Sequence, residues 1–172
     1  MKTTENITLV GMPSAGKSTV GVLLAKRLGY KFIDSDLLIQ EREGRLLKEI
    51  IAQDGMDGFM RIENEVNAGI LETHSVIAPG GSVIYYKEAM EHLSSISLIV
   101  YLHISYEEMV RRIGNIKDRG VVLKDGMSLL GLYEERAALY ETYADLTIDE
   151  EGLGCGQVVD LLREKIEKKD LD

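Results

Sequence analysis

The stretch Gly11-Met12-Pro13-Ser14-Ala15-Gly16-Lys17-Ser18 decides the fold of this chain, because it matches the phosphate-binding pattern G-x-x-x-x-G-K-[ST]. In such a loop, backbone N–H groups and the start of a helix surround phosphate oxygens, and the lysine reaches the β- and γ-phosphates. The hydroxyl that follows the lysine ligates Mg²⁺. We therefore expect a nucleotide with Mg²⁺, bound through Gly11, Ser14, Ala15, Gly16, Lys17, Ser18 and Thr19.

The residues on either side of this loop supply the strand and the helix that it needs. Ile7–Val10 is a short β-branched and apolar run, and apolar residues after Lys17 recur with a helical period up to Gly29. Two residues inside the loop are unusual. Pro13 supplies no backbone donor, and Ser14 stands where many small kinases have another glycine. Neither occupies a position that the pattern requires.

The alternation of short apolar runs with helical stretches continues along the chain. It predicts an α/β fold in which crossover helices connect a parallel sheet. Segment 114–126 has no period and contains three glycines, so we expect a mobile loop there. The expected strands are Ile7–Val10, Lys31–Asp34, Ser75–Ala78, Leu98–His103 and Leu146–Ile148, and the later helices are expected at about 37–53 with a break near Gly44, 58–71, 87–93, 106–112, 127–143 and 157–168.

Length and composition indicate one domain, 1–172, with 45% hydrophobic and 28% charged residues. The 20 Lys and Arg against 29 Asp and Glu give a net charge of −9, which disfavours nonspecific binding to nucleic acid or to an anionic membrane. No apolar run approaches the roughly 20 residues of a membrane span. The single Cys155 cannot form an internal disulfide, so we expect a cytoplasmic protein, and a monomer that acts on a small molecule.

A larger set of residues extends the pattern beyond the loop: Gly11–Gly21, Phe32-Ile33-Asp34-Ser35-Asp36, Gly55, Phe59, Glu63, Gly80-Gly81, Arg112, Arg119, Glu135-Arg136, Tyr140 and Ala144-Asp145. With these residues the sequence resembles the shikimate kinase family from about Ile7 to Ile148. The resemblance implies a three-layer P-loop kinase fold with a five-stranded parallel sheet in the order 2-3-1-4-5. It also implies an acceptor-binding helical region at 37–72 and a lid at 114–126.

The resemblance assigns roles to two carboxylates after the second strand. It implies that ATP and Mg²⁺ are the cofactors, that Asp34 helps to hold Mg²⁺, and that Asp36 orients the acceptor hydroxyl. A carboxylate suits that task, because phosphoryl transfer depends on positioning and charge stabilisation more than on covalent chemistry. Asp36 also has a structural interpretation as a helix N-cap, since an apolar helical pattern follows it directly.

Two arginines each have two interpretations. Arg119 matches the family's lid arginine, which compensates charge on the transferred group, although Gly120-Val121-Val122 replaces the usual Pro-Leu-Leu after it. An exposed loop arginine is its alternative. Arg112 matches the arginine that covers the adenine ring, and its alternative is a cation favoured by the dipole at a helix C-terminus.

The acceptor pocket is where the sequence departs from the family. Arg136 matches one of the two arginines that grip the shikimate carboxylate, but Met60 stands at the position of the other. Arg61 comes next, and a one-residue step along a helix rotates a side chain by about 100°, so we do not expect it to fill the same place. Pro79 precedes Gly80-Gly81 where the family commonly has three glycines.

Together these residues predict an ATP- and Mg²⁺-dependent kinase that phosphorylates a hydroxyl of a small metabolite. Lys17, Asp36 and Arg119 are the expected catalytic residues. A nucleoside monophosphate kinase shares the architecture, but the pair Asp34 and Asp36 favours a hydroxyl acceptor. The expected acceptor contacts are Asp36, Met60, Arg61, Glu63, Gly80, Gly81 and Arg136.

The acceptor has several interpretations. It is shikimate if the family substrate is kept, with Arg61 or a shifted helix restoring the grip. If Met60 lines the pocket, we expect Glu63 to be an unpaired acceptor, and a hydroxy amino acid would then place its carboxylate at Arg136 and its ammonium at Glu63. A neutral polyol is a further candidate. A noncatalytic nucleotide-binding regulatory module is the alternative outside enzymes.

Overall fold

A computed structural model describes residues 5–114, 123 and 125–169. Its centre is a five-stranded sheet in the order β2-β3-β1-β4-β5, and every paired neighbour is parallel. This confirms the predicted α/β class and the strand order that the family resemblance implied. The strands are β1 (Asn6–Gly11), β2 (Lys31–Asp34), β3 (Ser75–Ala78), β4 (Leu98–His103) and β5 (Leu146–Asp149).

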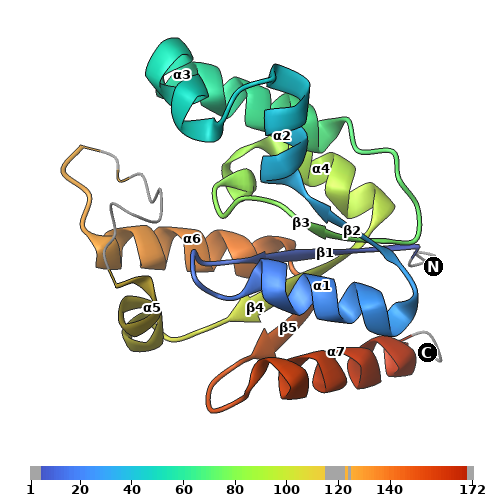
Figure 1. Ribbon diagram of the computed structural model, residues 1–172. Helices are drawn as coiled ribbons and strands as arrows, with labels where there is room; N and C mark the ends of the chain where they lie inside the picture. Colours follow the sequence, from blue (N-terminus) through green and yellow to red (C-terminus); the bar gives the residue numbers. More distant parts are fainter. Residues whose placement is uncertain (1–4, 115–122, 124, 170–172) are drawn as a thin grey trace.

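Helices cover both faces of this sheet and give three layers (Figure 1). The helices α1 and α7 lie side by side on one face, whereas α4 and α6 lie on the other, and α2 and α3 extend beyond the β2 edge. The bounds are α1 (Lys17–Leu28), α2 (Ser35–Glu43), α3 (Leu47–Ala68), α4 (Lys87–Ile96), α5 (Tyr106–Ile113), α6 (Leu129–Tyr143) and α7 (Cys155–Lys169), with a 3₁₀ turn η1 (Val83–Tyr85) that the sequence did not predict.

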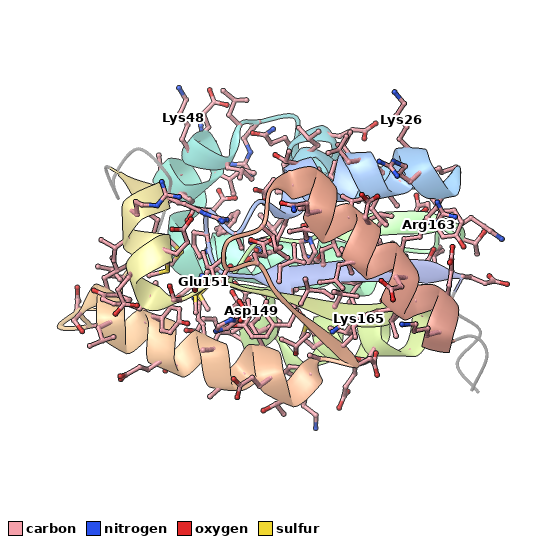
Figure 2. All side chains as sticks on the ribbon, turned by 90° about the horizontal axis from the view of Figure 1, so that it is seen from below. Lys26, Lys48, Asp149, Glu151, Arg163 and Lys165 are labelled. Carbon is pink, nitrogen blue, oxygen red and sulfur yellow. The ribbon has the colours of Figure 1, made fainter. Side chains whose placement is uncertain are left out.

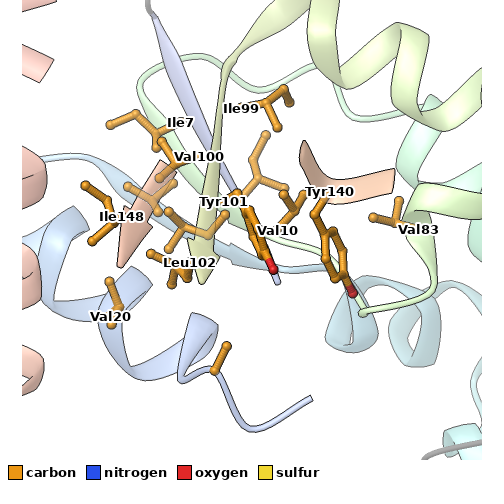
Figure 3. Packing of buried hydrophobic residues seen from close by; sticks show 14 of the residues in the cluster. Ile7, Val10, Val20, Val83, Ile99, Val100, Tyr101, Leu102, Tyr140 and Ile148 are labelled. Atoms are coloured by element: carbon orange, nitrogen blue, oxygen red, sulfur yellow. The ribbon is translucent and has the colours of Figure 1, made fainter. Parts of the chain in front are cut away.

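The core is built on the central strands, which are buried along almost their whole length. Crossover helices exclude water from both faces, so burial does not alternate along β1 and β4, and even Asn6 and Thr8 of β1 are buried. On the α6 side, the Tyr101 ring of β4 stacks on Tyr140, with ring centroids 5.1 Å apart (Figure 3). This contact fixes α6 against the carboxyl ends of the strands.

The helical region after β2 bends at two glycines. Gly44 ends α2 with a φ of 63°, where the sequence predicted a break. Gly55 has a φ of 73° inside α3, so the two helices expected around it form one kinked element. Arg45 connects α2 with α3 across the bend, because its guanidinium lies 3.1 Å from an oxygen of Glu43 in α2 and 2.7 Å from an oxygen of Asp54 in α3. The bend turns one face of α3 toward the end of β3.

Charged side chains cover the outside of the fold. Figure 2 shows Lys26, Lys48 and Arg163 pointing away from the ribbon, whereas Lys165 reaches the Thr147 carbonyl oxygen of β5 at 3.5 Å. Several cations pair with carboxylates one helical turn away, for example Arg163 with Glu167 at 2.8 Å. Among the described residues, no helix is both long enough and apolar enough to cross a membrane.

Candidate active site

The phosphate-binding loop leaves β1 and enters α1 as the motif predicted. A Cβ atom on Gly11 would lie 2.7 Å from the Leu102 carbonyl oxygen, so only glycine fits against β4 at this point. The loop then turns through Ser14 and Gly16, whose φ angles are 70° and 79°. Ser14 adopts this left-handed conformation despite its Cβ atom, which explains why glycine is common at such a position. The backbone follows the course that phosphate binding needs.

Lys17 folds back over this loop. Its Nζ donates to the carbonyl oxygens of Gly11 at 2.8 Å and Met12 at 2.9 Å. Burial is the main cause that lowers its pKa to about 8; the Arg136 charge acts in the same direction, and carboxylates led by Asp36 oppose the shift. The ammonium group is therefore held at the mouth of the loop by weak acceptors, which phosphate oxygens would replace.

Two candidate oxygen ligands for a cation meet where β2 ends: the hydroxyl of Ser18, from α1, and the carboxylate of Asp34, the last residue of β2. The Ser18 hydroxyl donates to Asp34 Oδ2 at 3.4 Å, and Asp34 Oδ1 accepts from the Asp36 backbone N–H at 2.9 Å. Asp34 is thus the N-cap of α2, and the interpretation of Asp36 as the cap is wrong. Mg²⁺ prefers oxygen ligands and commonly takes one or two carboxylates together with substrate phosphates, so the Ser18 and Asp34 pair fits this ion.

Because Asp34 caps the helix, the Asp36 side chain is left for another task. Burial raises the pKa of Asp36, the neighbouring Asp34 charge raises it further, and Lys17 opposes both effects. A raised pKa makes a carboxylate a better proton acceptor for a hydroxyl group. Asp36 therefore has the electrostatic character that its predicted role requires.

The turn after β3 brings the acceptor residues together. A Cβ atom on Gly80 would lie 2.5 Å from Glu63 Oε1 and 3.6 Å from Asp36 Oδ1. On Gly81 it would lie 2.9 Å from Arg136 Nη1. Both glycines are therefore needed because side chains from three helices close on the same piece of backbone. Four elements that are distant in the sequence meet at this turn.

Arg136 is 6% exposed, and its Nε has no hydrogen-bond partner among the described residues. The guanidinium lies over the Tyr85 ring at 5.5 Å, and the Tyr140 hydroxyl beside it donates to the Gly81 carbonyl oxygen at 2.6 Å. An aromatic face stabilises a cation without occupying its N–H donors. The buried guanidinium thus keeps a donor available for an anion.

Glu63 is not the unpaired acceptor that the sequence suggested. It is 1% exposed and accepts hydrogen bonds from the Ser82 hydroxyl at 2.8 and 3.0 Å and from the Tyr86 hydroxyl at 2.7 Å. Sequence reasoning missed both hydroxyl groups, because neither belongs to the family pattern and no helical or strand spacing joins them to Glu63.

Met60 and Arg61 differ in burial, although both line one surface pocket beside Tyr86. Met60 is partly buried and packs against the main core cluster. Arg61 has 70% of its side chain exposed and lies 3.7 Å from Glu65 on the outer face of α3. The one-residue step therefore separates Arg61 from the buried Arg136, as the helical rotation predicted.

Arg112 lies on the nucleotide side of the site, at the end of α5. Its guanidinium donates to Glu108 at 2.6 Å and to Glu150 at 3.1 Å, and it reaches the Ser14 carbonyl oxygen at 3.4 Å. Glu150 is 3% exposed, and sequence reasoning did not find it. Arg112 thus joins α5 to the phosphate-binding loop. Arg119 and most of segment 114–126 lie outside the described residues.

A parallel sheet with this strand order, a phosphate-binding loop after β1 and a carboxylate beside a glycine turn define the class of P-loop kinases that act on small molecules. Comparisons with known proteins narrow this class. A family model described as shikimate kinase matches residues 13–167.

Individual relatives agree with the family model. The chain is 34% identical over 165 residues to a shikimate kinase of Synechococcus sp. (strain RCC307), covering 94% of this chain and 84% of that one. It is 38% identical over 154 residues to the Mycobacterium avium (strain 104) shikimate kinase, covering 88% and 87%. The structure of a shikimate kinase from Acinetobacter baumannii in complex with shikimate has a TM-score of 0.87 and 30% identity, covering 99% of this chain and 97% of that chain.

The chain therefore belongs to the shikimate kinase family. It is an ATP-dependent small-molecule kinase with Mg²⁺ as its metal cofactor, and the comparisons do not favour a noncatalytic module or a changed acceptor.

Proposed function

We propose that this enzyme transfers the γ-phosphoryl group of ATP to a hydroxyl group of shikimate and so produces 3-phosphoshikimate. The observation that carries the proposal is that Asp36 lies beside Gly80 and Arg136 lies beside Gly81, so both side chains face the same turn. A small hydroxy acid needs a base for its hydroxyl and a cation for its carboxylate, and both groups face this turn. The relatives are named shikimate kinases, and one structural neighbour is in complex with shikimate.

The described residues divide the chemistry between them. Arg136 binds the acceptor carboxylate with its guanidinium, whose Nε–H has no partner among the described residues, and Asp36 orients the hydroxyl and takes its proton during transfer. Lys17 leaves the Gly11 and Met12 carbonyl oxygens for phosphate oxygens and balances their charge. Ser18 and Asp34 would hold Mg²⁺, which would supply further charge neutralisation for the phosphates. We also propose 37–72 as the acceptor-binding region, since it carries Glu63 and Met60.

The direct test measures ADP release with Mg²⁺-ATP and shikimate, beside homoserine, threonine, serine and simple polyols. We expect turnover with shikimate. Turnover of another acceptor without shikimate would contradict the proposed substrate. ADP binding without any turnover would contradict catalysis itself.

Two arginine variants provide a matched comparison within this assay. Arg136→Met removes the buried cation, and we expect the KM for shikimate to rise by about 30-fold or more, as when one partner of a buried charge pair is lost. Arg61→Met removes the exposed arginine of α3, and we expect a KM within about twofold of the original value, because surface ion pairs contribute little. Equal effects of the two variants would contradict the assignment of the carboxylate to Arg136.

A further inference from the structure

The Glu63 carboxylate is held by hydroxyl groups from a neighbouring segment of the chain. Ser82 precedes η1, and Tyr86 stands at the N-cap position of α4, so the two donors come from either end of one short connection. Their three contacts with Glu63 measure 2.7 to 3.0 Å. Glu63 and Tyr86 are 1% and 8% exposed, so water does not supply these hydrogen bonds instead.

This cluster lies directly behind the acceptor turn. Glu63 Oε1 would be 2.5 Å from a Cβ atom on Gly80, and Asp36 Oδ1 would be 3.6 Å from the same atom. Both carboxylates therefore approach Gly80 from its Cβ side, and Glu63 is the one in closer contact with the glycine. The Val83 backbone N–H donates to the Gly80 carbonyl oxygen at 3.1 Å and closes the turn above the cluster.

A carboxylate at this depth needs donors to remain ionised. Burial raises the pKa of Glu63 and the charge of Asp36 adds to this, whereas the Tyr86 and Ser82 hydrogen bonds and the Arg136 charge lower it. A buried carboxylate that lost a donor would carry an unsatisfied oxygen, and the surrounding backbone would shift to satisfy it. Ser82 directly follows Gly80 and Gly81, so a shift of this donor would move the turn.

We propose that Ser82 and Tyr86 are positioning residues of the acceptor site: their hydroxyl groups hold Glu63 against Gly80 and so fix the Gly80-Gly81 turn between Asp36 and Arg136. Two neutral donors satisfy this carboxylate, so the site does not need a cation at Met60 to hold Glu63. The proposal rests on the proposed function only in that the acceptor binds at this turn.

The kinetic test uses Ser82→Ala and Tyr86→Phe, each of which removes one hydroxyl group. Each variant leaves an oxygen of the buried Glu63 carboxylate without its donor, and we expect the acceptor KM to rise by about tenfold or more as the turn shifts. We expect the dissociation constant of ADP to stay within about twofold, because the phosphate-binding loop is not part of the cluster. The double variant should fall short of the product of the single effects, since both donors serve one carboxylate.

Two control variants remove the same groups elsewhere. Ser95→Ala deletes a hydroxyl that donates to the His92 carbonyl oxygen near the end of α4, and Tyr30→Phe deletes the hydroxyl of a ring that contacts the His74 ring before the start of β2. We expect both controls to keep the original KM. Controls that raise the acceptor KM as much as Ser82→Ala and Tyr86→Phe would overturn the proposal.

A second measurement does not depend on the identity of the acceptor. Amide hydrogen exchange should be faster over residues 79–86 in Ser82→Ala and Tyr86→Phe, and unchanged over residues 11–18. Faster exchange in a protein that does not phosphorylate shikimate would support the positioning role while contradicting the proposed substrate. A lower melting temperature with unchanged KM and unchanged exchange would overturn the positioning role and leave only core packing.

Discussion

The nucleotide half of the site, residues 11–18 with Asp34, differs from the acceptor half in how it is assembled. The nucleotide half is almost one continuous stretch of chain, and its lysine and backbone turn are set by the residues next to them. The acceptor half takes Asp36 from α2, Glu63 from α3, the Gly80-Gly81 turn from the end of β3, and Arg136 from α6.

This difference in assembly determines which amino-acid substitutions each half of the site tolerates. A contiguous loop uses backbone donors, so Pro13 and Ser14 can replace other residues while the loop keeps its course. The acceptor half depends on side chains that meet only in the folded protein, so a lost group must be replaced from another element. Ser82 and Tyr86 hold Glu63 in this way from the connection before α4.

Lys17→Ala should have the largest effect on turnover, because it removes the only charged side chain of residues 11–18. We expect turnover to fall by about 10³-fold or more, because the variant loses the cation that stabilises the transferring phosphoryl group. Steady-state ADP release at saturating acceptor measures this loss. A melting temperature close to that of the original protein would show that the fold survives, and retained turnover would contradict the role of Lys17.

Asp36→Asn should break the acceptor half while it preserves the nucleotide half. The amide keeps the size of the carboxylate but is a poor proton acceptor, so we expect kcat to fall by about 10²-fold or more. The dissociation constant of ADP should stay within about threefold, since Asp34 still caps α2 and still faces Ser18. Calorimetric titration with ADP separates the two quantities. Unchanged turnover would remove Asp36 from the chemistry.

Met60→Arg sharpens the comparison, because it adds a cation only to the acceptor half. We expect the KM for shikimate to fall by about three- to tenfold, as a second guanidinium reaches the carboxylate from the inner face of α3. Met60 packs against the core, so stability should fall by about 1–3 kcal/mol. Urea unfolding and acceptor kinetics measure the two effects. A higher KM in a folded variant would indicate that Arg136 alone defines the carboxylate site.

The same contrast explains how far the sequence could predict this molecule. Apolar runs located all five strands, and the loop motif located Lys17 and Ser18, because these signals lie between neighbouring residues. The strand order came from family resemblance, and the structure confirms it. The N-cap of α2, an alternative interpretation for Asp36, is Asp34, since the helix begins two residues earlier than its apolar pattern.

Contacts between distant residues could not be predicted. No period connects Glu63 with Ser82 and Tyr86, and the pairing needs the bend of α3 and the turn after β3 to exist first. Glu150 was missed for the same reason, since its partner Arg112 is 38 residues earlier in the sequence, before segment 114–126. Polar residues without a motif become interpretable only when the fold supplies their partners.

The smallest predicted effect compares a buried and an exposed carboxylate of α3 through pH. Asp36, Ser82, Tyr86 and Arg136 face Glu63, and burial is the main cause of its raised pKa. Glu63 in the native protein therefore stays protonated to a higher pH than Glu63 in the unfolded chain, which titrates near 4.5. The stability that Glu63 contributes is full below that pH and is lost as the pH rises through the native pKa.

Glu65 supplies the opposite case on the same helix. The hydrogen bond from Arg42 lowers the pKa of Glu65, so its contribution is present above pH 4.5 and is lost as the pH falls. Between pH 4.5 and 8, we expect Glu63→Gln to gain stability relative to the original protein as the pH rises. Glu65→Gln should lose relative stability as the pH rises toward 4.5 from more acid values, because the native and unfolded states differ there in the protonation of Glu65. Urea unfolding at several pH values measures both differences, and the same sign in the two variants would show that Glu63 titrates like a surface carboxylate, which contradicts its place in the acceptor half.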